Sequence, residues 1–156
     1  MRYLMLVVAF CYATLLSAQL PKVYDETIDP MAQIDAAIAK ARAEGKHVMC
    51  QVGGNWCPWC LRLADFVQKD SLVNETMQAG YVYIHVNYPR KGAAPELMRR
   101  LDNPGRFGYP VLVVLDAEGR RLHTQDSSFL EEGQGYNQGR LLRFLKGWTP
   151  EACKPE

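Results

Sequence analysis

The sequence predicts an α/β protein whose central mixed β-sheet is flanked by helices on both faces. Segments with the apolar spacing of helices alternate along the chain with short apolar runs that are typical of buried strands. They follow in the order helix, strand, helix, strand, helix, hairpin, helix, which favours parallel and antiparallel neighbours in one sheet. The 156 residues suit one domain with a short appendage, and 48% hydrophobic residues suffice for its core. A formal charge of +1 gives no reason to expect nucleic acid as a partner.

The first 18 residues form the appendage. Arg2 precedes an apolar run from Tyr3 to Leu16, and the small residues Ser17 and Ala18 follow. A basic start, a short apolar middle and small residues at the end are typical of a secretory signal peptide. The run is shorter than the about 20 residues that span a bilayer. We therefore expect cleavage after Ala18 and a domain of residues 19–156 in the periplasm or another extracytoplasmic space.

The first helix and strand of the domain have clear boundaries. Asp29 is a good N-cap and Pro30 a good first helical residue, so a helix is expected from there to Glu44. Gly45 fits the end of this helix. The apolar run Lys46–Val52 then predicts a short strand that is buried on both faces.

Apolar periodicity, helix caps and turn residues assign the other elements. A lead-in from Leu20 to Ile28 is expected to be extended. The expected helices are Leu61–Gln68, Ser71–Gly80, Pro95–Leu101 and Asn137–Trp148. The expected strands are Tyr81–Asn87, Val111–Leu115 and Arg120–Thr124, and the expected turns and loops are Tyr88–Ala93, Asp102–Gly108, Asp116–Gly119 and Gln125–Gly135. The last loop is predicted to be polar and to expose the pair Phe129 and Leu130.

Two cysteines, Cys57 and Cys60, follow the first strand at its junction with a helix. If Cys57 lies at the first helical turn, its sulfur faces unpaired backbone N–H groups and the positive end of the helix dipole. Both favour a thiolate, and a pKa of about 7 instead of about 8.5 would make the sulfur half ionised at neutral pH. Cys60 lies on the same helical face and can close a short disulfide with it. Pro58 costs little at a first helical position.

Zinc binding or an inert structural disulfide would also explain such a pair. A tetrahedral zinc site needs four ligands, and no second C-x-x-C or H-x-H pair follows in the sequence. Carriage of copper or zinc by the two cysteines is a further alternative, which the lack of a nearby methionine- or histidine-rich tract disfavours. We therefore expect redox chemistry with no metal and no cofactor.

The pattern resembles the thioredoxin superfamily. Trp56, Cys57, Pro58, Trp59 and Cys60 after a buried strand match its signature, and Gly108, Tyr109 and Pro110 before a hairpin match its cis-proline loop. The resemblance covers roughly residues 30 to 148 and is greatest to exported thioredoxin-like proteins of bacteria. It implies a thioredoxin-like fold in which Cys57 is the nucleophile and Cys60 the resolving thiol. It also implies that Trp56, Pro58, Trp59, Tyr109 and Pro110 bind the substrate.

One departure from the family concerns the proton of the resolving thiol. Thioredoxin has a buried aspartate six residues before its nucleophile, whereas this chain has Gln51, which does not titrate. Asp65, Glu75 or a water molecule are the candidates to replace it. The residues between the cysteines, Pro58 and Trp59, add no positive charge to hold the thiolate.

Cleavage after Ala18 would remove Cys11 and leave two cysteines outside the motif. Cys50 is interpreted as a small core residue, and Cys153 as a free thiol or a link to another chain. The histidines are expected to be structural. The three histidines His47, His85 and His123 show no ligand spacing. Trp56 is expected to pack beneath the site and Trp59 to lie more exposed beside it.

The sequence thus predicts an exported thiol–disulfide oxidoreductase that reduces protein disulfides. Its expected partners are proteins with disulfides or thiols and an electron donor, either a thiol protein or a membrane reductase; nucleic acid is not expected, and we expect a monomer. A disulfide oxidase or isomerase remains an alternative, because the potentials of such proteins span about 150 mV and one dipeptide does not fix them. A binding module that uses the aromatic rim without turnover is the alternative from another class.

Overall fold

A four-stranded mixed sheet forms the centre of the molecule in the computed structural model, which describes residues 19–90 and 94–155. The strands lie in the order β2-β1-β3-β4, with β1 parallel to β2 and antiparallel to β3, and β3 antiparallel to β4. Their bounds are β1 His47–Gly53, β2 Tyr81–Asn87, β3 Val111–Leu115 and β4 Arg121–Asp126. The predicted mixed sheet is confirmed.

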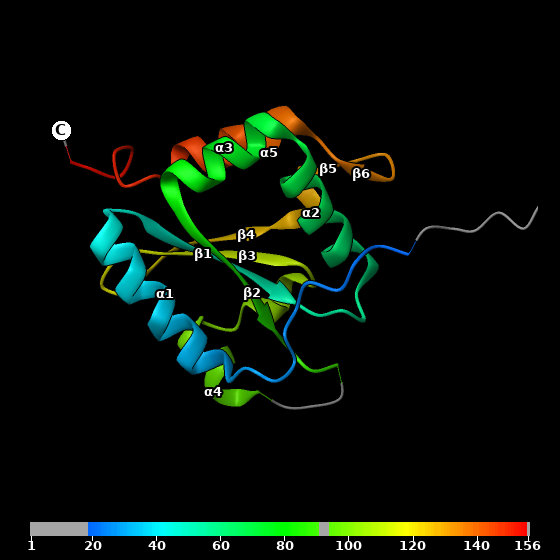
Figure 1. Cartoon of the computed structure of the whole chain (residues 1–156), viewed down its shortest axis with the longest axis horizontal. Coiled ribbons are helices and arrows are strands. Elements are labelled where there is room, and N and C mark those ends of the chain that lie inside the picture. Colours follow the sequence, from blue (N-terminus) through cyan, green and yellow to red (C-terminus); the bar gives the residue numbers. More distant parts are fainter. Residues whose placement is uncertain (1–18, 91–93, 156) are drawn as a thin grey trace, which may run out of the picture.

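Helices cover both faces of this sheet (Figure 1). One face carries α1 (Pro30–Glu44) and α4 (Pro95–Arg100), and the other carries α2 (Pro58–Lys69), α3 (Ser71–Gly80) and α5 (Gln138–Gly147). Side chains of β1 alternate between two separate cores: Val48 and Cys50 pack with α1 and α4, whereas Met49 packs with α2, α3 and α5. This double burial explains the continuous apolar character of the strand.

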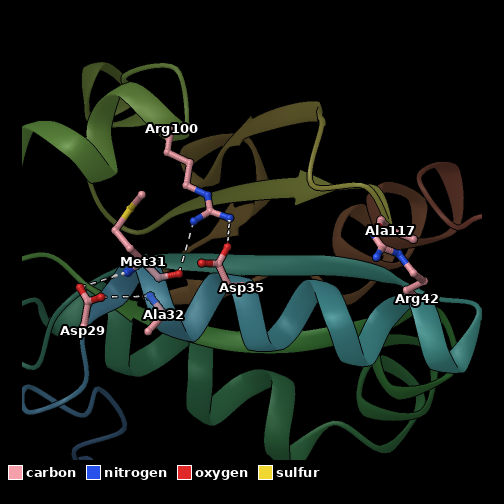
Figure 2. Close-up of polar contacts among 7 residues, drawn as sticks. All are labelled: Asp29, Met31, Ala32, Asp35, Arg42, Arg100 and Ala117. Carbon is pink, nitrogen blue, oxygen red and sulfur yellow. Dashed lines mark hydrogen bonds and ion pairs between the residues drawn. The ribbon is translucent and has the colours of Figure 1, made fainter.

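Polar contacts at both ends of α1 fix its position on the sheet (Figure 2). Asp29 caps the helix by accepting from two N–H groups of the first turn at 3.2 and 3.3 Å. Arg100 of α4 bonds to Asp35 at 2.5 Å, and Arg42 donates to the Ala117 carbonyl in the turn between β3 and β4 at 3.1 Å. The helix is therefore held to α4 and to the hairpin.

The segment before the last helix differs from its prediction as a polar loop. It contains the short 3₁₀ helix η2 (Ser127–Leu130) and a two-stranded ribbon of β5 (Glu131–Glu132) and β6 (Gly135–Tyr136). Phe129 is 72% exposed as expected, but Leu130 is only 3% exposed and the prediction for it is wrong. Leu130 packs into the core of α2, α3 and α5, a long-range contact that the polar local sequence does not indicate.

Two predictions lie wholly or partly outside the described residues. The signal peptide falls in residues 1–18, and the turn expected from Tyr88 to Ala93 includes residues 91–93. No helix in the described part of the chain has both the length and the apolar character needed to cross a bilayer.

Candidate active site

The first cysteine of the motif marks the start of α2. Cys57 has an extended backbone (φ −107°, ψ 105°) and is the N-cap, and Pro58 follows as the first helical residue. The Cys57 sulfur accepts a hydrogen bond from the N–H of Cys60 at 3.2 Å. The position expected from the sequence is confirmed, with the sulfur at the unpaired N–H groups and the positive end of the helix dipole.

Cys57 and Cys60 form a disulfide, with their Cα atoms 5.2 Å apart. The two residues differ in access, because Cys57 is 5% exposed and Cys60 is fully buried. Of the two residues, Cys57 is therefore the one that reaches the protein surface, where a disulfide or thiol of another protein can approach.

The loop before β3 reaches the same sulfur. The peptide bond between Tyr109 and Pro110 is cis, as expected from the resemblance. The Tyr109 carbonyl oxygen lies 3.6 Å from Cys57 Sγ. The Pro110 carbonyl accepts from the Ser127 hydroxyl at 2.6 Å, which ties the loop to η2. Two segments about fifty residues apart in the sequence thus meet at the disulfide.

Trp56 packs on the side of the site nearest the cis-proline loop. Its indole N–H donates to the Tyr88 carbonyl at 2.9 Å, and its ring packs edge-on against Tyr109 at 5.6 Å. The guanidinium of Arg90 lies 6.0 Å from the Trp56 ring.

Trp59 packs against a different tyrosine, Tyr136, whose ring lies edge-on to it at 5.7 Å. The Tyr136 hydroxyl donates to the Trp59 carbonyl at 3.1 Å, and the guanidinium of Arg62 lies 4.8 Å from the Trp59 ring. Both tryptophans are half-buried and Pro58 is exposed. The five predicted substrate-binding residues therefore surround the disulfide.

A buried polar network lies behind Cys60 in place of a carboxylate. The amide nitrogen of Gln51 donates to the Cys60 carbonyl at 2.9 Å and to the Tyr24 hydroxyl at 2.6 Å. The amide oxygen of Gln51 accepts from the Tyr83 hydroxyl. The candidates named from the sequence do not reach this network in the described residues, since Asp65 pairs with Lys69 and Glu75 is exposed on α3.

Tyr24 is a site residue that the sequence did not indicate. The side chain of Asn55 holds the backbone of this lead-in segment, accepting from the N–H groups of Val23 and Tyr24 at 3.1 Å each and donating to the Tyr24 carbonyl at 2.8 Å. Tyr24 is 4% exposed and packs with both cysteines. No local motif marks it, and Leu20, Val23 and Ile28 give the lead-in other apolar residues, so the sequence carries no signal that singles out Tyr24.

Cys50 and Cys153, the other cysteines of the described residues, lie away from the disulfide. Cys50 is buried in the core of α1 and α4, and burial raises the pKa of its thiol to about 12, so its expected structural role fits. Cys153 is a free, exposed thiol beyond α5. Within residues 19–90 and 94–155 no group of three or more His, Cys, Asp or Glu side chains is placed to hold a metal ion.

The histidines are held by packing. His47 Nδ1 lies 2.8 Å from the Trp148 carbonyl, and the His123 ring stacks on Trp148 at 4.4 Å. His85 packs against the rings of Tyr24 and Tyr83, and its Nε2 atom is buried with no hydrogen-bond partner among the described residues. Burial lowers the pKa of His85 from 6.5 to about 4, so its ring is neutral near pH 7.

Comparison with known proteins agrees with the fold and the motif. Residues 29–117 match the family described as thioredoxin-like, and the chain belongs to this family. The disulfide bond reductase DsbH of Chlamydia pneumoniae is 29% identical over 75 residues, a match that covers 45% of this chain and 45% of that protein. The chain thus matches less than half of that relative's length.

Two solved structures share the fold. A thioredoxin from Thermus thermophilus is 26% identical with a TM-score of 0.52, over 72% of this chain and 80% of that one. A disulphide isomerase from Xylella fastidiosa Temecula1 has a TM-score of 0.69 at 20% identity, over 79% of this chain and 93% of that one. At 20% identity, the likeness to the disulphide isomerase shows a shared fold and nothing more.

Because burial lowers the pKa of His85, we expect the folded protein to lose stability in mild acid. The unfolded chain binds a proton at His85 near pH 6.5, whereas the folded protein does so only near pH 4, so stability falls as the pH drops through this interval. The contribution of His85 between pH 7 and pH 5 is about 2 kcal/mol. Urea unfolding of the protein and of His85→Leu at both pH values should show a smaller loss in the variant. An equal loss in both proteins would contradict the assignment.

Proposed function

We propose that this protein is an exported thiol–disulfide oxidoreductase that reduces disulfides of other proteins. The observation that carries the proposal is the Cys57–Cys60 disulfide at the start of α2, with Cys57 as the reachable sulfur. Helix N–H groups favour a thiolate at Cys57, which is the form that attacks disulfides. Membership of the thioredoxin-like family supports the same chemistry.

The reaction follows from the different access of the two sulfurs. The Cys57 thiolate attacks one sulfur of a substrate disulfide, a mixed disulfide forms, and the first substrate thiolate leaves. Cys60 then attacks Cys57 Sγ, the internal disulfide forms and the second substrate thiolate leaves. The substrate gains two electrons and the Cys57–Cys60 dithiol loses them. Because Cys60 is fully buried, it resolves the mixed disulfide without competing for the substrate.

The residues around the disulfide suit an extended polypeptide with an apolar side chain near its cysteine. We assign Trp56, Trp59 and Pro58 to the apolar contact surface and the Tyr109–Pro110 loop to the backbone contact. The Tyr109 carbonyl, 3.6 Å from Cys57 Sγ, is placed to accept an N–H from such a segment. Proteins with disulfides or thiols are therefore the expected substrates.

The direction of electron flow is proposed as reduction. The relative that matches over 75 residues is named a disulfide bond reductase, and the 26% identical structure is named a thioredoxin. The protein then needs an electron donor, either a thiol protein or a membrane reductase, to restore its dithiol. The alternative activity for the same site is oxidation or isomerisation of disulfides in other proteins.

Export is proposed from the N-terminal pattern of a basic residue, an apolar run and small residues. N-terminal sequencing of the protein from its native host, or from a bacterial host that exports it, should find Gln19 as the first residue. A protein that retains Met1 and stays in the cytoplasm would contradict export.

Insulin reduction in the presence of dithiothreitol tests the enzymatic activity. The protein should accelerate the precipitation of insulin, and Cys57→Ser and Cys60→Ser should each reduce the rate to the background, because the reaction needs both sulfurs. Cys153→Ser, which removes the exposed free thiol, is the matched control and should keep the full rate. If the protein binds insulin without accelerating its reduction, it is a binding module rather than an enzyme.

Equilibration with glutathione buffers tests the direction. We expect the potential of the Cys57–Cys60 pair to lie closer to the about −270 mV of thioredoxin than to the about −120 mV of a strong oxidant. The fraction of dithiol at each glutathione ratio can be measured by thiol alkylation and mass spectrometry. A potential at the oxidising end would replace reduction by oxidation as the activity.

A further inference from the structure

The hydrogen bonds of Gln51 leave only one orientation for its side-chain amide. The Cys60 carbonyl accepts hydrogen bonds but donates none, so the amide atom 2.9 Å from it is the NH₂ group. The same nitrogen lies 2.6 Å from the Tyr24 hydroxyl, and the amide oxygen accepts from the Tyr83 hydroxyl. Both protons and the oxygen of the amide are thereby used.

This orientation determines the role of the Tyr24 hydroxyl. The Tyr24 oxygen accepts a hydrogen bond from the Gln51 amide, so the O–H group of Tyr24 is free to donate a hydrogen bond to another acceptor. The hydrogen bonds of the described residues include no nitrogen or oxygen acceptor for that proton. Burial raises the pKa of Tyr24 well above its ordinary value, so the proton stays on the hydroxyl at neutral pH.

The sulfur of Cys60 and this hydroxyl border the same small space beside β1. A Cβ atom placed on Gly53 would lie 2.4 Å from Cys60 Sγ and 3.0 Å from the Tyr24 hydroxyl oxygen, so the two atoms approach the same point beside β1. Tyr24, Cys57 and Cys60 also form one buried cluster. In the disulfide, Cys60 Sγ carries no charge. After reduction it is free of Cys57 and can ionise.

We propose that the Tyr24 hydroxyl, oriented by Gln51, donates a hydrogen bond to the Cys60 thiolate and favours its attack on the mixed disulfide. The inference rests on the dithiol chemistry proposed above. In this step the bond from Cys60 to Cys57 Sγ forms and the bond from Cys57 to the substrate sulfur breaks. The proton that Cys60 loses as it ionises is balanced by the proton that the departing substrate thiolate takes up, and Tyr24 keeps its own. Tyr24 stabilises charge and transfers no proton.

The titratable groups beside the network in the described residues add no charge that would do this instead. They are Cys57 of the motif, Tyr83 and His85 of β2, Tyr109 of the cis-proline loop and Tyr136 of β6. Burial raises the pKa of the three tyrosines and lowers that of His85, so these four side chains are neutral at pH 7. A hydrogen bond is therefore the available means of stabilising the Cys60 thiolate.

The test measures the pKa of Cys60 in full-length mature protein that carries Cys57→Ala and also Cys153→Ser, which removes the exposed free thiol. The pH dependence of thiolate absorbance or of alkylation of Cys60 reports this pKa without any turnover. Because a hydrogen bond to a charged group is worth about one pKa unit or more, Tyr24→Phe should raise the pKa of Cys60 by about one unit. The rate of alkylation at pH 7 should fall about tenfold. Gln51→Leu, which frees the hydroxyl, should raise the pKa in the same direction.

Tyr81→Phe is the matched control, because it removes a buried tyrosine hydroxyl that bonds to the Leu145 carbonyl at 2.5 Å and not to the network behind Cys60. A shift of at least about half a unit in Tyr24→Phe, with none in Tyr81→Phe, supports the proposal. A smaller shift in folded Tyr24→Phe, or an equal shift in the control, overturns it. If Tyr24→Phe does not fold, the shift in Gln51→Leu decides by the same criterion. Insulin reduction is scored separately, so failure of the proposed function is distinguishable from failure of this inference.

Discussion

The site depends on the way in which the chain passes from a fully buried strand into a helix. β1 ends at Gly53 and α2 begins at Pro58, so the motif has four residues in which to turn. A Cβ atom on Gly53 would lie 2.4 Å from Cys60 Sγ, and one on Gly54 would lie 2.3 Å from the indole nitrogen of Trp56. Two consecutive glycines are needed here because the sulfur and the indole occupy the space of their missing side chains.

The sheet then brings the second half of the site to this turn. Val52 of β1 pairs with Val111 of β3 in antiparallel register, so the chain that enters β3 passes beside the chain that leaves β1. Tyr109 and Pro110 stand directly before Val111 and therefore reach Cys57. Cores on both faces of the sheet hold the two strands in this register. The short distance between Cys57 Sγ and the Tyr109 carbonyl oxygen is thus a consequence of the pairing of β1 with β3 and not of contacts within the loop.

The parts that could be predicted from the sequence are those with a local signature. Asp29 before Pro30 gave the start of α1, and the two cysteines after an apolar run gave the start of α2. The ribbon of β5 and β6 was missed, because its glutamate- and glycine-rich sequence is polar and its one large apolar residue, Tyr136, becomes buried only by packing on α2. Local patterns do not contain such long-range contacts.

The network behind Cys60 was missed for the same reason, and its composition changes how the resolving step is understood. Tyr24 and Gln51 are 27 residues apart in the sequence, and the hydrogen bonds of Asn55 hold the lead-in at the site. A carboxylate at the Gln51 position would titrate together with the buried thiol, so their pKa values would belong to the pair. An amide removes that coupling, and His85 is neutral, so the Tyr24 hydroxyl is the group beside Cys60 that can stabilise the charge of its thiolate. The lead-in segment is therefore part of the site, because it supplies this hydrogen-bond donor.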